Sequence, residues 1–127
     1  MSKIKVSTLT GALLNYWVAK AEGLNVDMPE PDPEFEFIYI WRDYGCTLPH
    51  GESGSEDVFD PVNDWSDAGP IIEREKIGPI PRIDDTWYAE VPMEIKQDGV
   101  FQVGPTPLIA TMRCFVASKF GEEVDDE

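Results

Sequence analysis

The sequence predicts an α+β domain in which two helices, over about residues 10–22 and 107–120, pack on a small, mostly antiparallel sheet. Three observations support this prediction. Start and stop signals flank both helical segments, and runs of aromatic and β-branched residues lie between them. The chain has 127 residues, of which 42% are hydrophobic, which is enough for one ordinary domain with a core. We therefore expect residues 1–127 to form a single domain.

The first helix is preceded by residues 3–6, which alternate polar and apolar and predict a short strand. Ser7 or Thr10 is expected to cap the helix, and Gly23 to end it. Asn15 is expected to face water together with Lys20. The predicted buried stripe consists of Leu13, Leu14, Trp17, Val18 and Ala21.

The middle of the chain predicts irregular structure around one strand. Residues 26–34 are expected to form an extended, acidic, proline-rich linker, because DMPEPDP places prolines at alternate positions. Residues 35–41, FEFIYIW, predict a strand, and residues 42–45 a turn. Residues 46–70 are expected to form a long loop, polar and turn-rich at first and then ordered around Trp65.

The second half predicts a hairpin before the last helix. Residues 70–77 predict a short strand or a helical turn. Residues 86–93 and 100–103 predict two strands joined by a turn at the QDG tripeptide. Residues 122–127 form an acidic tail that we expect to fray.

The last helix places an arginine on an apolar face. Thr106 is a suitable N-cap, Pro107 suits the first helical position, and Gly121 is a suitable stop. At about 100° per residue, Arg113 falls near the middle of the apolar face, and Thr111 falls on the opposite, polar side. Such an arginine must be paired, must extend to an edge, or must bind an anion.

Charge and cysteine content restrict the class of partner and the compartment. The net charge of −15 argues against direct binding to nucleic acid or to an anionic membrane. It is compatible with a partner that has a basic face, with mimicry of a polyanion, or with solubility alone. The two cysteines, Cys46 and Cys114, show no metal or disulfide spacing. With no signal peptide and no apolar run of about 20 residues, we expect a cytoplasmic protein.

Three blocks of the sequence resemble a known family. They are TLTGALLNYWVAKAEG near the start, DWSDAGPIIERE in the middle and GPTPLIATMRCFVASKFGEEV at the end. In this order they are similar to the NinX-like proteins, a phage and prophage family. The resemblance implies a phage-encoded accessory protein expressed in a bacterial cytoplasm, and it transfers no catalytic residues.

Two arginines are candidate binding residues. Arg113 is expected either to form a buried ion pair with Glu73 or Glu75, or to receive a phosphate or carboxylate together with Arg74. The first alternative is structural and the second predicts a site for a small anionic ligand such as a nucleotide. Trp65 either pins its loop to the core or serves as a binding anchor beside these residues.

An acidic ladder begins within the proline-rich linker and continues into the predicted strand. In an extended chain its alternate carboxylates point the same way, roughly 6.5–7 Å apart. That spacing is close to the phosphate spacing of one DNA strand, so the ladder is compatible with a DNA mimic that inhibits a host DNA-binding protein. It is equally compatible with a solvated strand face that protects a sheet edge. Its members are Glu30, Asp32, Glu34 and Glu36.

The sequence gives little support for an enzyme. His50 has no obvious nucleophile partner, and no hydrolase, P-loop or zinc-protease motif is present. Aspartates at 84–85 and at 64 and 67 could hold Mg²⁺, but we expect no metal and no cofactor. We therefore expect a non-enzymatic protein that binds a host macromolecule, in host takeover or counter-defence. The alternatives are the small anionic ligand and the DNA mimic, and the oligomeric state stays open.

Overall fold

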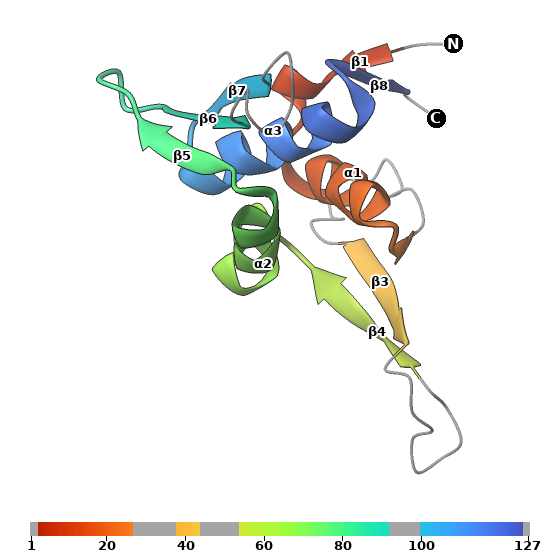
Figure 1. Cartoon of the computed structure of the whole chain (residues 1–127). Helices are drawn as coiled ribbons and strands as arrows, with labels where there is room; N and C mark the ends of the chain where they lie inside the picture. Colours follow the sequence, from red (N-terminus) through yellow and green to blue (C-terminus); the bar gives the residue numbers. More distant parts are fainter. Residues whose placement is uncertain (1–2, 27–37, 44–53, 92–99, 126–127) are drawn as a thin grey trace.

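The computed structural model describes residues 3–26, 38–43, 54–91 and 100–125. Three helices and three small antiparallel sheets, with strand orders β1-β8, β2-β3-β4 and β5-β6-β7, confirm the α+β class (Figure 1). In chain order the elements are β1 (Lys3–Lys5), the 3-10 helix η1 (Val6–Thr8), α1 (Gly11–Glu22), β2 (Asn25–Val26), β3 (Ile38–Asp43), β4 (Gly54–Phe59), α2 (Trp65–Glu75), β5 (Gly78–Pro81), β6 (Trp87–Val91), β7 (Val100–Gly104), α3 (Pro107–Phe120) and β8 (Glu123–Asp125). None of the helices in these ranges is long and apolar enough to cross a bilayer.

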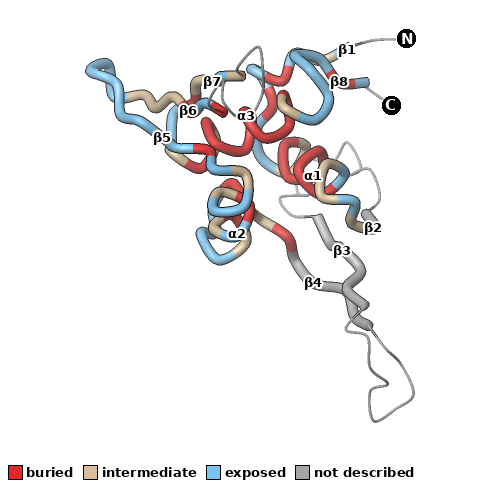
Figure 2. Tube along the Cα trace, in the orientation of Figure 1, coloured by how far each residue is buried: buried red, intermediate tan, exposed pale blue. Residues whose placement is uncertain are grey.

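Helix α3 is the centre of the molecule. It packs against α1, α2 and all three strands of the β5-β6-β7 sheet (Figure 1). Every residue from 110 to 117 is buried, so α3 has no solvated face over these two turns (Figure 2). The predicted polar side is therefore wrong at Thr111, which is fully buried. Its hydroxyl donates to the carbonyl of Pro107, one turn earlier in the same helix, and this satisfies it without water.

The start of α3 is fixed as the sequence predicted. Thr106 is the N-cap, and its hydroxyl accepts from the backbone N–H of Ile109 at 3.1 Å. Pro107 occupies the first helical position. Just before them, β7 approaches α3 so closely that a Cβ at Gly104 would lie 2.7 Å from the backbone nitrogen of Ala110. Only glycine fits there, and its lack of a side chain lets the end of β7 lie against the first turn of α3.

Helix α1 also begins and ends where predicted, with Thr10 as N-cap and Gly23 in the left-handed conformation. The expectation that Asn15 faces water is wrong, because its side chain is fully buried. Its amide nitrogen donates to the Asp60 carboxylate at 2.8 Å, and its amide oxygen accepts from the backbone N–H of Val62 at 3.1 Å. Asn15 therefore joins α1 to the segment that precedes α2.

Helix α2 corrects the expectation of a long loop over residues 46–70. That range contains β4 and the first half of α2. Asp64 caps α2 by accepting from the backbone N–H of Ser66 at 2.9 Å. Pro70 lies inside α2 and has no N–H to donate to the carbonyl of Ser66, four residues earlier. Ser66 is exposed, so this carbonyl belongs to a residue at the surface.

The C-terminal end differs from expectation in a similar way, whereas the short strand predicted at the N-terminal end is present as β1. The acidic tail was expected to fray over residues 122–127, but Glu123–Asp125 forms β8 and pairs with β1. Lys3 and Asp125 lie opposite one another and form an ion pair at 2.7 Å. The turn expected at residues 42–45 is wrong at its start, since β3 continues to Asp43. The expected turn at QDG and most of the predicted 26–34 linker lie outside the described residues.

The close approach at Gly104 gives a stability prediction. Gly104→Ala should lower the free energy of unfolding by about 1–3 kcal/mol, because the added methyl meets backbone atoms that cannot move aside. Urea denaturation followed by circular dichroism measures this change. Gly78→Ala is the matched control, because no heavy atom lies within 4 Å of its added carbon. Equal stability of the two variants would contradict the proposed strand–helix contact.

The buried amide of Asn15 gives a second prediction. Asn15→Ala should lower the free energy of unfolding by about 1–3 kcal/mol, because the buried N–H of Val62 loses its acceptor. The control is Asn63→Ala, since Asn63 is exposed although it also donates to Asp60 at 3.2 Å. We expect the control to lose at most about 0.5 kcal/mol. If Asn15→Ala unfolds at the same urea concentration as the wild type, the interaction does not connect the elements as described.

Candidate binding surface

Arg113 is buried, with 8% of its surface exposed, and it is bound to backbone carbonyls. Its Nε donates to the carbonyl of Leu9 at 2.9 Å, and a terminal nitrogen donates to the carbonyl of Val103 at 2.8 Å. Burial lowers the pKa of the guanidinium, which nevertheless stays protonated near neutral pH. Arg113 therefore ties the η1–α1 junction to β7 across the middle of α3.

The predicted ion pair between Arg113 and Glu73 or Glu75 is not formed. Glu73 is exposed on α2. Glu75 pairs with Arg74 at 2.7 Å and with Lys119 at 3.6 Å. The guanidinium of Arg113 satisfies carbonyl groups instead of neutralising a carboxylate, so it acts as a backbone crosslink.

Arg74 is also engaged in contacts within the protein. Its Nε donates to Glu75, and its terminal nitrogens donate to both oxygens of Glu22 on α1. These carboxylates raise the pKa of Arg74. Its guanidinium carbon lies 5.8 Å from the centroid of the buried Phe115 ring. The structure thus uses Arg74 to hold α2 against α1 and α3.

The two arginines predicted to share an anion site lie on different sides of α3. Arg74 covers Phe115, and Arg113 is two residues before Phe115 in the helix, which rotates it by about 200° away from that ring. The structure therefore does not bring these two guanidinium groups together.

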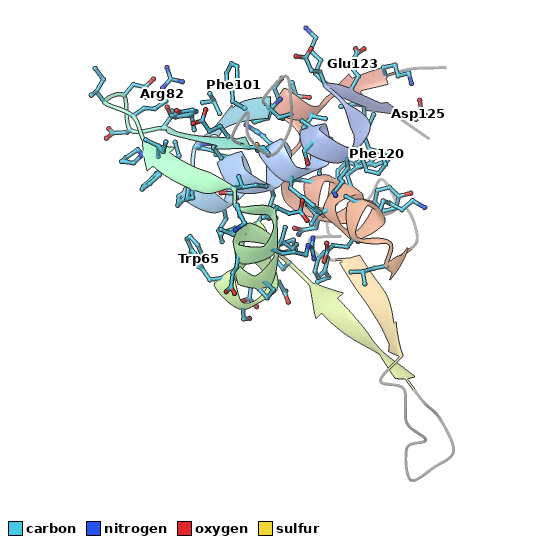
Figure 3. The ribbon with its side chains drawn as sticks, viewed as in Figure 1. Trp65, Arg82, Phe101, Phe120, Glu123 and Asp125 are labelled. Atoms are coloured by element: carbon cyan, nitrogen blue, oxygen red, sulfur yellow. The ribbon has the colours of Figure 1, made fainter. Side chains whose placement is uncertain are left out.

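Trp65 is the first residue of α2 and is 54% exposed. The interpretation that its ring pins the segment to the core is therefore wrong. Ala68 and Ile71, which are buried, attach α2 to the core instead. Trp65 remains available at the surface, apart from the other labelled aromatic residues (Figure 3).

A larger apolar surface lies on the β5-β6-β7 sheet, and the strand register defines it. Directly opposed residues share a face, so the buried Ala89 and Val91 mark the inner face, which packs on α3. The alternate residues form the face turned away from α3. We call this the outer face, and its apolar members are Ile80, Tyr88 and Val103, which form one cross-strand row, and Phe101 in the adjacent row.

The outer face exposes large side chains. Phe101 is 66% exposed and Ile80 is 42% exposed, while Tyr88 and Val103 between them are partly exposed. Ile83, in the turn that joins β5 to β6, is fully exposed. Figure 3 shows Phe101 and the nearby Arg82 on the side of the sheet away from α3. Aliphatic and aromatic residues exposed together in this way are typical of an interaction surface.

Each edge of this sheet is partly blocked for strand addition. Arg82 N–H donates to the Thr86 carbonyl at 2.8 Å at the end of the β5–β6 hairpin. This bond shows that the backbone of Arg82 faces β6, and ladder bonds recur at every second residue. The nitrogens of Pro79 and Pro81 therefore face the free edge, where a proline has no N–H to donate. At the opposite edge, the carbonyl of Val103 is already bound by Arg113. The outer face is therefore more accessible to a partner than either edge.

Acidic residues lie within the outer face and at its hairpin end. Glu90 lies in the same cross-strand row as Phe101. Asp84 and Asp85 lie in the exposed β5–β6 turn, where Arg82 provides the one basic side chain and approaches Asp84 at 4.0 Å. This surface thus combines an apolar centre with a largely negative rim.

Two further groups were considered from the sequence, the acidic ladder and the aspartates that could hold Mg²⁺. The acidic ladder of Glu30, Asp32, Glu34 and Glu36 lies outside the described residues. Within the described ranges, no group of three or more His, Cys, Asp or Glu residues is arranged to hold a metal ion. Ile80 and Phe101 were not predicted as surface residues. The sequence of residues 100–103, VFQV, contained a usable signal, because the adjacent apolar residues Val100 and Phe101 must lie on opposite faces of a strand.

The sequence was compared with known families and proteins. The family model described as Bacteriophage P22, NinX matches residues 5–119. The match includes η1, α1, α2, the whole β5-β6-β7 sheet and α3 as far as Lys119. No curated protein matches the chain.

The carbonyl contacts of Arg113 give a prediction that distinguishes a crosslink from a ligand site. Arg113→Met should lower the free energy of unfolding by about 3–6 kcal/mol, because a hydrogen bond from a charged donor contributes about 1.5–3 kcal/mol and two are lost. The control, Arg82→Met, removes an exposed arginine and should cost less than about 1 kcal/mol. Thermal and urea unfolding measure both. An Arg113→Met variant with wild-type stability would show that the carbonyl contacts do not hold the fold.

Proposed function

The chain belongs to the Bacteriophage P22 NinX family, and we propose that this phage-encoded protein acts by binding a protein of its bacterial host through the outer face. Binding of this kind would serve host takeover or counter-defence. The proposal commits to a host protein and to non-enzymatic action.

The observation that carries the proposal is the exposure of Phe101 and Ile80 on a sheet whose other face is already covered by α3. Transfer of one such side chain from water into an interface contributes about 1.5–3 kcal/mol. Aromatic side chains at the centre of a patch are frequent anchors of protein interfaces. An apolar centre with a charged rim is also the usual anatomy of such interfaces.

The proposed absence of catalysis is supported by the roles of the reactive groups that the structure describes. The Cys114 thiol is fully buried in α3, and burial raises its pKa to about 12, so it is almost entirely protonated near neutral pH. Asp60 is held by Asn15 and Asn63. Arg74 is held by Glu22 and Glu75. These groups connect elements of the fold.

Site-specific photo-crosslinking in infected cells tests the proposal. With a photoreactive phenylalanine analogue in place of Phe101, we expect one host protein to be linked reproducibly and to be identified by mass spectrometry. The control places the same analogue at Lys20, which is exposed on α1. Adding Ile80→Asp to the Phe101 probe should abolish the link, because a charge is then placed in the apolar centre.

Two outcomes would contradict the proposal. One is the absence of any host protein linked from position 101 under conditions in which the probe is incorporated and the protein accumulates. The other is the same set of linked proteins from positions 101 and 20, which would indicate contact by random collision.

A further inference from the structure

We propose that the occupant of the outer face is a basic amphipathic helix of the partner protein. The proposal rests on the proposed function and specifies the chemistry of that partner. The helix would lie across the sheet opposite α3 and give it a third layer.

The dimensions of the sheet suit one helix. Its three strands, spaced about 4.8 Å apart, are about 10 Å across, and the seven residues between positions i and i+7 of a helix span about 10.5 Å along its axis. The inner face of the same sheet already accommodates one helix, α3. Apolar residues at positions i, i+3, i+4 and i+7 of an incoming helix would cover the row of Ile80, Tyr88 and Val103, with Phe101 beside it.

Backbone chemistry argues against an extended peptide as the occupant. Strand addition needs a free N–H and C=O edge. Pro79 and Pro81 remove donors from the β5 edge, and Arg113 occupies the Val103 carbonyl on the β7 edge. A helix satisfies its own backbone hydrogen bonds and needs only side-chain contacts from the sheet.

Charge complementarity indicates that the partner helix is positively charged. Glu90, Asp84 and Asp85 outnumber Arg82 around the apolar centre, and the whole chain has a net charge of −15. Lysine and arginine residues flanking the apolar stripe of the helix would therefore be attracted to this rim. The same charge disfavours a second copy of this chain as the occupant, because it would bring two acidic surfaces together.

Titration with designed peptides tests the proposal. The probe is a 14-residue peptide of leucine and lysine in helical amphipathic order, and its control is a peptide of the same composition in scrambled order. Both carry the same charge, so general attraction to an acidic protein affects them equally. We expect the amphipathic peptide to bind at least tenfold more tightly and to shift amide NMR signals of residues 78–91 and 100–104.

Uncharged substitutions locate the binding. Phe101→Ser and Ile80→Ser should each lower the affinity for the amphipathic peptide, and the double variant should lower it at least tenfold. The matched control is Trp65→Ser, which also removes an exposed apolar side chain without a change of charge, and it should alter the affinity by less than twofold. Circular dichroism and urea unfolding establish whether each variant is folded. If the double variant is unfolded, the peptide affinities of the two single variants test the proposal.

The results that would overturn the proposal are specific. Equal affinity for the two peptides, or equal effects of Phe101→Ser and Trp65→Ser, would mean that attraction is general and that the outer face is not a helix site. The experiments distinguish a failure of the proposed function from a failure of the helix proposal. If the peptide binds as expected but position 101 links no host protein, the proposed function is contradicted. If position 101 links a host protein through an extended or acidic segment, the function stands and the helix proposal fails.

Discussion

The structure depends on the burial of α3 over residues 110–117. A helical stretch with no solvated face requires every polar group it carries to find a partner inside the protein. Thr111 does so within its own helix, and Arg113 does so across it, on the carbonyls of Leu9 and Val103. The buried arginine is therefore accommodated because two backbone segments, at Leu9 and at Val103, present carbonyls that need a donor there.

The same constraint explains the arrangement around α3. The entry to the helix combines a glycine without room for a Cβ, a threonine cap and a proline at the first helical position, so β7 is held directly against the helix it precedes. Arg113 then binds the outward carbonyl of Val103 on β7, which partly blocks that edge of the sheet, while prolines limit the other. With α3 on the inner face and both edges partly blocked, the outer face is the more accessible surface of the sheet.

The two predicted helices, with Thr10, Thr106 and Gly23 at their ends, were correctly predicted because capping is a local property of the chain. The errors arose where hydrogen-bond partners decide which side chains are buried. Asn15 and Thr111 have polar side chains that predict exposure. Asn15 is buried because it binds the distant Asp60, and Thr111 because it binds a carbonyl of its own helix. Helix α2 was missed because Pro70 predicts a break, although the spacing of Ala68, Ile71 and Ile72 was a usable signal of a helix. The outer face depends on strand register, which single-strand patterns do not specify.

The most direct measurement of the central claim is hydroxyl-radical footprinting of the protein, first purified and then inside infected host cells. The account predicts that oxidation of Phe101 falls severalfold in the cells, while oxidation of Trp65, exposed on a different element, changes little. Protection of Phe101 alone would place the partner on the outer face. Oxidation of Phe101 to the same extent in both preparations would contradict the claim that this face is occupied when the protein acts.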